Sequence, residues 1–214
     1  MANVYMYVVD RDFGFAPNPF HNICTLATCK PDLRRVAKKD DWVIGMGGAR
    51  LNATGRCIFA MKISDSITYD EYWTNPAYKD KKPIPNGSKK MIVGDNIYHL
   101  ESGLWQQTNS HHSHADGSPN PHNIKNDTRT NAVLISNYFF YFGSTAIQIP
   151  PKLLKEIGYT NSRGHRKFEI NQSKNIIEYL EKNFKANTLH GDPFDFKSAN
   201  YKYSAENNRL TVGV

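Results

Sequence analysis

Short runs of apolar and β-branched residues, separated by glycine, proline and polar turns, make up most of the first 150 positions. Runs of this length and composition are typical of β-strands rather than helices. The predicted strands are Val4–Val9, Ile23–Cys29, the run DDWVIGMGG, the hairpin-like continuation RCIFAMKISDSIT and Asn131–Tyr141. Because Asn131–Tyr141 is the most apolar run of the chain, we expect it to form a central strand.

Helical patterns are fewer than strand patterns. A proline precedes Asp32–Lys38, which is predicted as a short helix with its acid at the positive end. DEYW at Asp70–Trp73 predicts a short turn or helix, and IPPKLLKEIG predicts a helix that begins at Pro151 and ends at Gly158. The stretch Ser173–Phe184 is predicted as an amphipathic helix, because apolar residues stand at positions 176, 177, 180 and 184.

This order of elements predicts an α+β protein, with a small curved β-sheet or barrel, peripheral helices and a C-terminal amphipathic helix. We expect one domain over residues 1–214, with a barrel-like core at 1–150, a helical extension at 151–190 and a surface tail at 191–214 that wraps the surface or frays. The pattern contains no alternating strand and helix units, no GxGxxG and no P-loop glycines. It therefore gives no support for a nucleotide cofactor at a helix N-terminus and indicates no other cofactor.

Composition and charge point to a polyanionic partner. Of the 214 residues, 12 are Tyr, 11 are Phe and 3 are Trp, an aromatic excess that suits a sheet-built protein with stacking surfaces. The formal net charge is +7. Since a basic surface gains affinity and association rate from phosphates, nucleic acid or a nucleotide is the expected partner. The pattern does not indicate an oligomeric state.

The chain also shows no pattern of a secreted or membrane protein. The opening MANVYMYVVD has no basic stretch followed by a long apolar run, and no window of about 18 apolar residues occurs. We expect a soluble cytoplasmic protein, and its three cysteines, Cys24, Cys29 and Cys57, fit a reducing compartment. On a strand, Cys24 and Cys29 would face opposite ways, so we expect buried structural thiols rather than a shared metal site.

One polar loop, residues 95–122, holds five of the eight histidines. It shows neither strand nor helix periodicity, and an ordered loop of this length is usually functional. Three interpretations of His111, His112 and His114 are open: metal ligands, general acid/base groups oriented by Asp95 or Asp116, or hydrogen-bonding groups of a structural or recognition loop. The candidate catalytic residues are His112, His114, Asp95 and His99, and no metal is specified.

Two further groups of residues suit a nucleic-acid ligand. In SRGHR two guanidiniums flank an imidazole, a donor set that matches phosphate oxygens, although a surface turn that anchors the C-terminal helix is an equal alternative. The candidate phosphate-binding residues are Arg163, His165 and Arg166. Aromatic rings beside amides are typical of sites that hold an unpaired base. The candidate base-binding residues are Trp42, Trp105, Gln106, Asn18 and Phe20.

Two resemblances to known families follow from the motifs. From Ile23 to Trp73, KKDDWVIG followed by GRCIFAMKISDSITYDEY resembles the PUA-like barrel, especially its EVE and YTH branches, although Asp40 and Asp41 replace the usual Gly-Asp. Over nearly the whole chain, a set of segments resembles the bacterial nucleotide modification associated domain 2 family: FGFAPNPFHNICTLATCKP, GDNIYH, WQQTNSHHS, VLISNYFFYFG and RGHR. The first resemblance implies a PUA-like barrel core that binds a base. The second implies a role beside DNA or nucleotide base modification and supplies no mechanism.

Two hypotheses about function result. The first is a nucleic-acid or nucleobase binding protein associated with base modification, which recognises a base in an aromatic pocket. The alternative is an enzyme of DNA or nucleotide base modification, whose His-rich loop supplies acid/base or metal chemistry. Both predict that the 95–114 loop, the SRGHR turn and the APNPF loop line one cavity, with His112 or His114 near Trp105, because the polar groups of a buried loop need partners.

Overall fold

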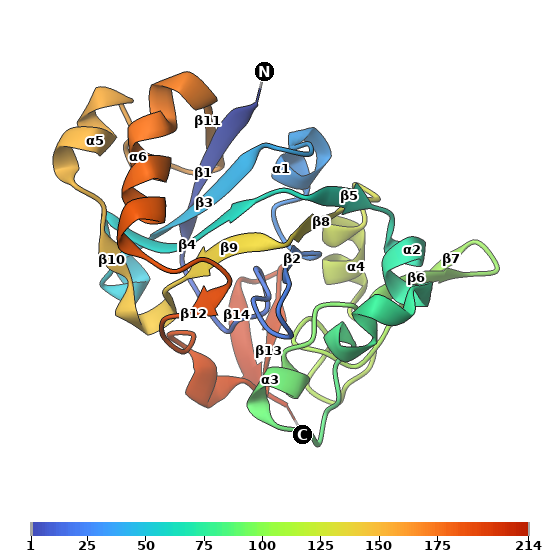
Figure 1. Cartoon of the computed structure of the whole chain (residues 1–214). Coiled ribbons are helices and arrows are strands. Elements are labelled where there is room, and N and C mark those ends of the chain that lie inside the picture. Colours follow the sequence, from blue (N-terminus) through green and yellow to red (C-terminus); the bar gives the residue numbers. More distant parts are fainter. Residues whose placement is uncertain (1, 214) are drawn as a thin grey trace.

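The computed structural model describes residues 2–213, and its largest sheet has seven strands in the order β11, β1, β3, β4, β9 and β12, with β10 paired to β4 (Figure 1). These strands are β1 (Asn3–Val9), β3 (Trp42–Gly47), β4 (Arg56–Lys62), β9 (Tyr138–Tyr141), β10 (Ile147–Gln148), β11 (His165–Glu169) and β12 (Thr188–Leu189). β1 pairs with β3 and β9 pairs with β12 in parallel, and the other pairs are antiparallel. The described strands form an open sheet, so the expected closed barrel is not found.

Three smaller sheets and six α-helices complete the α+β fold that the sequence predicts. The smaller sheets are β2 (Cys24–Leu26) with β8 (Val133–Ser136) and β5 (Asp65–Ile67), the hairpin β6 (Tyr98–Glu101) and β7 (Leu104–Gln107), and the hairpin β13 (Tyr201–Ser204) and β14 (Arg209–Val212). The helices are α1 (Pro31–Val36), α2 (Tyr69–Thr74), α3 (Lys89–Ile92), α4 (Pro121–Asp127), α5 (Pro151–Glu156) and α6 (Ile170–Asn183). Short 3-10 helices lie at Ala49–Leu51, Pro76–Lys81, Gly143–Thr145 and Phe196–Ser198.

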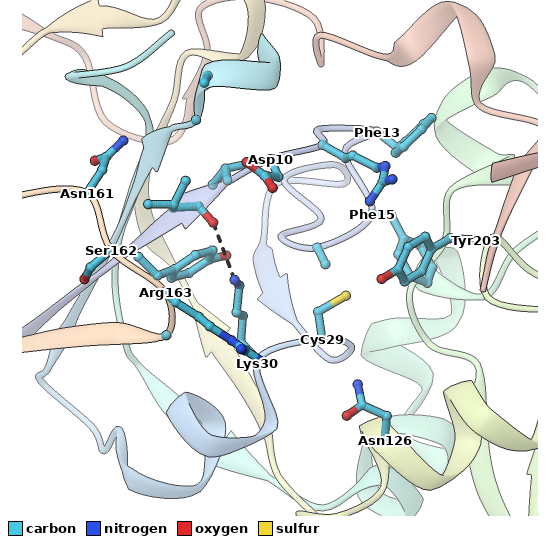
Figure 2. A pocket seen from close by; sticks show the side chains of 18 of the residues that line it. Asp10, Phe13, Phe15, Cys29, Lys30, Asn126, Asn161, Ser162, Arg163 and Tyr203 are labelled. Atoms are coloured by element: carbon cyan, nitrogen blue, oxygen red, sulfur yellow. Dashed lines mark hydrogen bonds between the residues drawn. The ribbon is translucent and has the colours of Figure 1, made fainter. Parts of the chain in front are cut away.

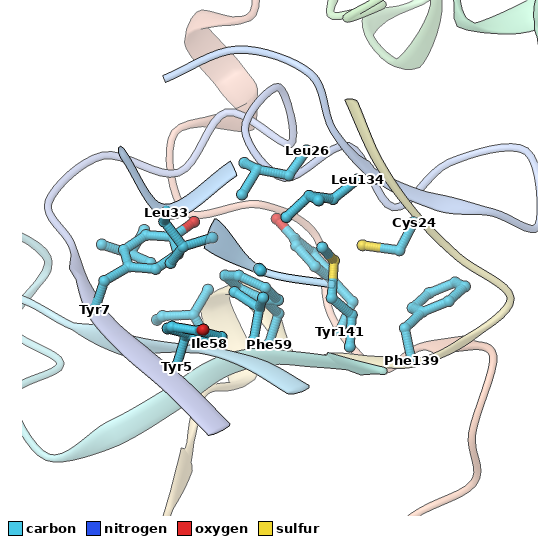
Figure 3. Close-up of a cluster of buried hydrophobic side chains, with 14 of the residues drawn as sticks. Tyr5, Tyr7, Cys24, Leu26, Leu33, Ile58, Phe59, Leu134, Phe139 and Tyr141 are labelled. Carbon is cyan, nitrogen blue, oxygen red and sulfur yellow. The ribbon is translucent and has the colours of Figure 1, made fainter. Parts of the chain in front are cut away.

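The large sheet is buried on both faces, because each face carries its own apolar cluster. One face packs against the apolar side of α6, where Ile176 and Leu180 are buried with Met6 of β1. The other face packs against the three-stranded sheet, where Tyr5 and Leu134 belong to one cluster (Figure 3). This explains why β1 and β3 have almost no exposed positions: alternate residues enter different cores.

The most apolar run does not form one central strand. It divides at Asn137, which is exposed, into β8 and β9, and these two strands belong to different sheets. The Ser136 hydroxyl donates to the carbonyl oxygen of Tyr138 (2.8 Å) and holds the bend between them. The run therefore links the two sheets that enclose the core shown in Figure 3.

The C-terminal third is more integrated than expected. Residues 151–190, predicted as a helical extension, contain α5 and α6 but also contribute β11 and β12 to the large sheet. Residues 191–214, predicted as a surface tail, form the hairpin β13–β14 up to Val212, and the last of them lies outside the described residues. Among residues 2–213 no helix is long and apolar enough to cross a membrane.

Candidate active site

A cavity of about 750 Å³ opens beside the C-terminal end of β1. Segments far apart in the sequence line it: residues 7–11, Phe13, Phe15 and Ala16, Cys29 with Lys30, Gly48, Ala49 and Thr54, His111 with His112, Asn126, 161–164 and Tyr203. Figure 2 shows Cys29 near the centre of the group, with Lys30 and Arg163 on one side and Tyr203 on the other. The pocket therefore combines a thiol, imidazoles, cations and aromatic rings in one space.

Cys29 lies at a sharp backbone turn just before α1. Its φ is 58°, in the left-handed region that is uncommon for residues other than glycine. The surrounding structure fixes this turn, because its N–H donates to Oδ1 of Asp127 (2.8 Å) and its carbonyl oxygen accepts from Nε of buried Arg34 (2.8 Å). An unusual conformation held by such contacts is typical of functional sites. The turn presents the Cys29 side chain to the pocket.

Cys29, His112 and Asp127 form a compact group of thiol, imidazole and carboxylate, with the imidazole in contact with both of the others. Nε2 of His112 lies 3.7 Å from Sγ of Cys29, and Nδ1 of His112 lies 2.7 Å from Oδ2 of Asp127. The carboxylate only accepts, so Nδ1 carries a hydrogen and donates to Asp127. Nε2 is left facing the thiol. This is the order of groups that activates a nucleophile by an oriented base.

The buried surroundings hold His112 and Asp127 in place. The side chains of Gln107 and Asn123 donate to the carbonyl oxygen of His112, and the hydroxyl of Tyr98 donates to Oδ2 of Asp127 (2.9 Å). The ring of Phe15 packs against that of His112, with centroids 4.8 Å apart. Both members of the pair are nearly inaccessible to water.

The electrostatics of the pair favour a charged imidazolium beside the thiol. Burial by itself lowers the pKa of His112, but the charges of Asp127 and Cys29 outweigh it and raise this pKa to about 10. The pKa of Asp127 is lowered in spite of its burial, because the positive charge and hydrogen bond of His112 stabilise the carboxylate. At neutral pH, His112 therefore presents a positive charge to Sγ of Cys29.

Within residues 2–213, the grouping of Cys29, His112 and Asp127 is also the one cluster of possible metal ligands, with ligand atoms within 4.8 Å of one another. The geometry does not suit three ligands to one ion. His112 uses Nδ1 for Asp127, and the carboxylate oxygens already accept from Cys29, His112 and Tyr98. Sγ and Nε2 are the ligand atoms without a protein donor or acceptor other than each other, whereas catalytic zinc sites use three protein ligands. The arrangement fits a thiol nucleophile better.

His111 lines the same pocket as a neutral group. Burial first, and then the positive charge of His112, lower the pKa of His111 to about 3, although the carbonyl oxygen of Tyr201 partly opposes this. Nδ1 of His111 lies 2.5 Å from that oxygen. A carbonyl only accepts, so Nδ1 is the donor and Nε2 is an acceptor nitrogen.

The lowered pKa of His111 predicts a stability loss in acid. Since the unfolded chain has an ordinary His pKa near 6.5, it binds more protons than the folded chain at pH values between about 6.5 and 3, and stability falls as pH falls through that window. His111→Asn keeps a donor for Tyr201 and removes the titration. From pH 7 to pH 5, the free energy of unfolding should fall by about 2 kcal/mol less in the variant than in the wild type, as measured by urea unfolding. An equal fall of the free energy of unfolding in both proteins would contradict the lowered pKa of His111.

The expected convergence of three segments is observed in part: His111, His112, Arg163 and Ala16 line the pocket, whereas Phe20, at the other end of the APNPF loop, does not. His112 does not lie beside Trp105, which instead packs edge-on against Tyr69 in another cluster. The roles of His112 and Arg163 remain predictions.

The other three predicted catalytic residues lie elsewhere. His114 is exposed, and Asp95 is buried where it accepts hydrogen bonds from Thr25 and Tyr72. His99 stacks on Trp73, with ring centroids 4.1 Å apart. None of the three lines the pocket. The candidate residues of the histidine loop therefore point in different directions. Their spacing in the sequence did not predict this.

The predicted base-binding residues lie outside this pocket. Trp42 is buried in β3 against Phe140, and Asn18 is buried with its side chain bonded to Val93 and Phe20. Trp105 and Gln106 lie on β7, outside the pocket. Phe20 stacks on Phe196, again away from the lining.

The SRGHR turn contributes only its first basic residue. Arg163 and Gly164 line the pocket, whereas His165 and Arg166 are part of β11. His165 packs edge-on against Tyr5, and Arg166 is exposed. A strand turns successive side chains to opposite faces, so the three donors do not form one cluster.

The sequence interpretation missed several pocket residues. Cys29 was expected to be a buried structural thiol at the end of a strand, but β2 ends at Leu26 and Cys29 reaches the pocket. Its position directly before the Lys30-Pro31 start of α1 is the one sequence signal that sets it apart. Asp127 and Tyr203 carry no such signal, because their contacts with the site are tertiary.

The fold and the pocket define an α+β protein with a thiol, an imidazole and a buried carboxylate grouped at the pocket wall. The chain belongs to the nucleotide modification associated domain 2 family, whose model matches residues 1–200. This membership links it to nucleotide modification. No curated protein and no solved structure matches the chain. The hairpin β13–β14, which contributes Tyr203 to the pocket, lies after the matched residues.

Proposed function

We propose that this protein is an enzyme of nucleotide modification in which Cys29 is a covalent nucleophile. The observation that carries the proposal is the grouping of Cys29, His112 and Asp127 at a pocket, with separations of 3.7 Å and 2.7 Å. Thiol nucleophiles are activated by a neighbouring imidazole that a third group orients. Family membership supplies the context of nucleotide modification.

The proposed reaction is a group transfer or hydrolysis at an electrophilic carbon. The thiolate of Cys29 attacks this carbon, so an S–C bond forms, while the bond to the leaving group breaks and the leaving group takes the proton of His112. Water or a second acceptor then gives a proton to His112 and attacks the same carbon. The S–C bond breaks, and the thiolate and imidazolium are restored.

A negative charge that develops during attack needs a donor. The N–H of Cys29 is already engaged with Asp127, so it does not serve this purpose. Asn126 lines the pocket, and Figure 2 shows its amide pointing into the space below Cys29. We assign the Asn126 amide as the donor that stabilises the charge, a role that side-chain amides perform in acyl-transfer enzymes.

A binding protein without covalent chemistry is the second candidate. The aromatic lining of the pocket favours it, because aromatic rings can stack on any base regardless of sequence. The lining rings are those of Tyr7, Phe13, Phe15 and Tyr203. The two candidates differ in one outcome. Cys29→Ser would leave binding and function intact if the protein only recognises a base.

The proposed function is tested by the reactivity of Cys29 toward iodoacetamide. An ordinary Cys thiol, with a pKa of about 8.5, is roughly 3% ionised at pH 7. In this protein the imidazolium of His112 should hold the thiolate, so alkylation at pH 7 should be about tenfold faster than in His112→Gln. Peptide mass spectrometry after timed alkylation measures the rate at each cysteine. Cys24 and Cys57 are internal controls, because burial raises the pKa of both thiols.

Gln is chosen because it removes the imidazolium but keeps a polar side chain of similar size, while Asp127 keeps its hydrogen bonds from the N–H of Cys29 and the hydroxyl of Tyr98. Circular dichroism should show the same fold in both proteins. Equal alkylation rates in the wild type and His112→Gln, with the fold intact, would contradict the proposed activation of Cys29.

A further inference from the structure

Positively charged side chains outnumber carboxylates among the residues that line the pocket. Arg11, Lys30 and Arg163 line it, while Asp10 is the one carboxylate among the lining residues. The charges of His112 and Asp127 offset each other within their pair. Because the three cations come from three separate segments, their approach to one cavity leaves an excess of positive charge there.

Two of these cations lie together on one side of Cys29, as Figure 2 shows for Lys30 and Arg163. Lys30 is held over the ring of Tyr7 at 4.6 Å and donates to the carbonyl oxygen of Val8 (3.4 Å). Burial lowers the pKa of Lys30, which means that its charged form is poorly solvated. Within residues 2–213, Arg163 has no ion pair and no hydrogen bond to the protein, so its guanidinium is free for a ligand.

A buried hydroxyl on the same side lacks a partner. Tyr7 lines the pocket and is only 2% exposed, and its hydroxyl has no hydrogen bond within the described residues. Burial, followed by the nearby thiols, raises the pKa of Tyr7, so the phenol stays protonated and remains a donor. The hydroxyl is covered by protein atoms, so Tyr7 supports Lys30 through its ring, and Lys30 and Arg163 are the groups that can bind an anionic oxygen.

The opposite side of Cys29 is aromatic. Tyr203 and Phe15 flank His112, with ring centroids 5.5 Å and 4.8 Å from that of the imidazole. Arg11 lies over the ring of Tyr203 at 5.2 Å and is tied to Asn208 of the same hairpin, so this wall is fixed. The neutral His111 adds an acceptor nitrogen beside these rings. Rings and an acceptor together suit a base with ring or exocyclic N–H groups.

We propose that the pocket binds a nucleoside monophosphate unit, with its phosphate at Lys30 and Arg163 and its base against Phe15 and Tyr203. Cys29 then lies between the two ends of the ligand. This inference rests on the proposed function, because it names the substrate class of the same thiol site. A cavity of about 750 Å³ is within the usual range of small-ligand sites, and it also admits one nucleotide turned out of a strand.

The test is protection of Cys29 from iodoacetamide by ligands. The arms contain the four deoxynucleoside 5′-monophosphates, the matching nucleosides, inorganic phosphate and a single-stranded oligonucleotide. We expect at least one monophosphate or the oligonucleotide to slow alkylation at a concentration at least tenfold below that of its nucleoside or of phosphate. Stronger protection by the oligonucleotide identifies a nucleic-acid source, and stronger protection by a monophosphate identifies a free nucleotide.

Arg163→Gln and Arg166→Gln form a matched pair, because Arg166 is exposed on β11 outside the pocket. Arg163→Gln should raise the half-protecting concentration about tenfold, and Arg166→Gln should leave it unchanged. No protection by any nucleotide, equal protection by nucleosides or by phosphate alone, or equal behaviour of the two variants would overturn the inference. Fast alkylation that depends on His112 but resists protection would leave the proposed thiol chemistry standing and remove only the substrate class.

Discussion

Asp127→Asn is expected to lower the alkylation rate of Cys29 at pH 6 by roughly 100-fold. An ordinary thiol is only about 0.3% ionised at this pH, whereas the imidazolium of His112 should keep the wild-type thiol ionised. An amide carries no charge to stabilise that imidazolium, and its NH2 group cannot accept from His112. The rate at which iodoacetamide modifies Cys29, followed by mass spectrometry from pH 5.5 to 8.5, should regain the pH dependence of an ordinary thiol.

The control for this variant is Asp95→Asn. Asp95 is also fully buried and accepts two hydrogen bonds, from Thr25 (2.6 Å) and Tyr72 (2.7 Å), but it lies outside the pocket. Both variants should lose stability, and only Asp127→Asn should lose thiol reactivity. The same rate loss in both would show that general destabilisation, not the orientation of His112, controls Cys29.

Local patterns in the sequence predicted most of the helices and strands. The amphipathic helix expected at Ser173–Phe184 is observed as α6 (Ile170–Asn183), because its stripe of apolar residues packs on the large sheet. The helix expected to begin at Pro151 does begin there. The division of residues 131–141 was not predicted, since both halves are equally apolar and only the hydrogen bonds at Ser136 reveal the bend.

Local sequence patterns also could not show whether the large sheet closes into a barrel. The expected barrel required its end strands to meet, but β11 and β12 remain at opposite ends of the pairing order. Which strands pair depends on contacts between segments distant in sequence, such as β1 with β11, and a strand pattern is the same in an open and a closed sheet.

The sequence predicted which distant segments approach each other at the candidate site, but not which side chains form its reactive group. A polar loop that becomes buried needs partners, and the pocket does bring His112 together with Arg163, but of the APNPF loop only Ala16 lines it. Cys29 was misassigned because the strand was extended to it. The left-handed turn and the Arg34 hydrogen bond that hold it become visible only in the folded chain.

Buried polar groups away from the pocket position its aromatic loop. Lys81 is 2% exposed and donates to the carbonyl oxygen of Asn18 (2.9 Å), to Oδ1 of Asn18 (2.8 Å) and to the carbonyl oxygen of Ile23 (2.6 Å). These bonds fix the end of the loop that carries Phe13 and Phe15 into the pocket. The fold therefore uses a buried cation as an anchor for the loop.

Lys81→Met is expected to lower the free energy of unfolding by about 3–5 kcal/mol. Methionine fills a similar volume, but it removes three hydrogen bonds, leaves the carbonyl oxygen of Ile23 without a donor and leaves Asp95 without its neighbouring positive charge. Burial lowers the pKa of Lys81 to about 8, partly offset by Asp95, so the ammonium is still the main form at pH 7 and the loss applies there. Urea unfolding at pH 7 measures it, with exposed Lys79→Met as the matched control. If the two variants unfold at the same urea concentration, Lys81 does not anchor the loop, and the placement of Phe13 and Phe15 must depend on apolar packing alone.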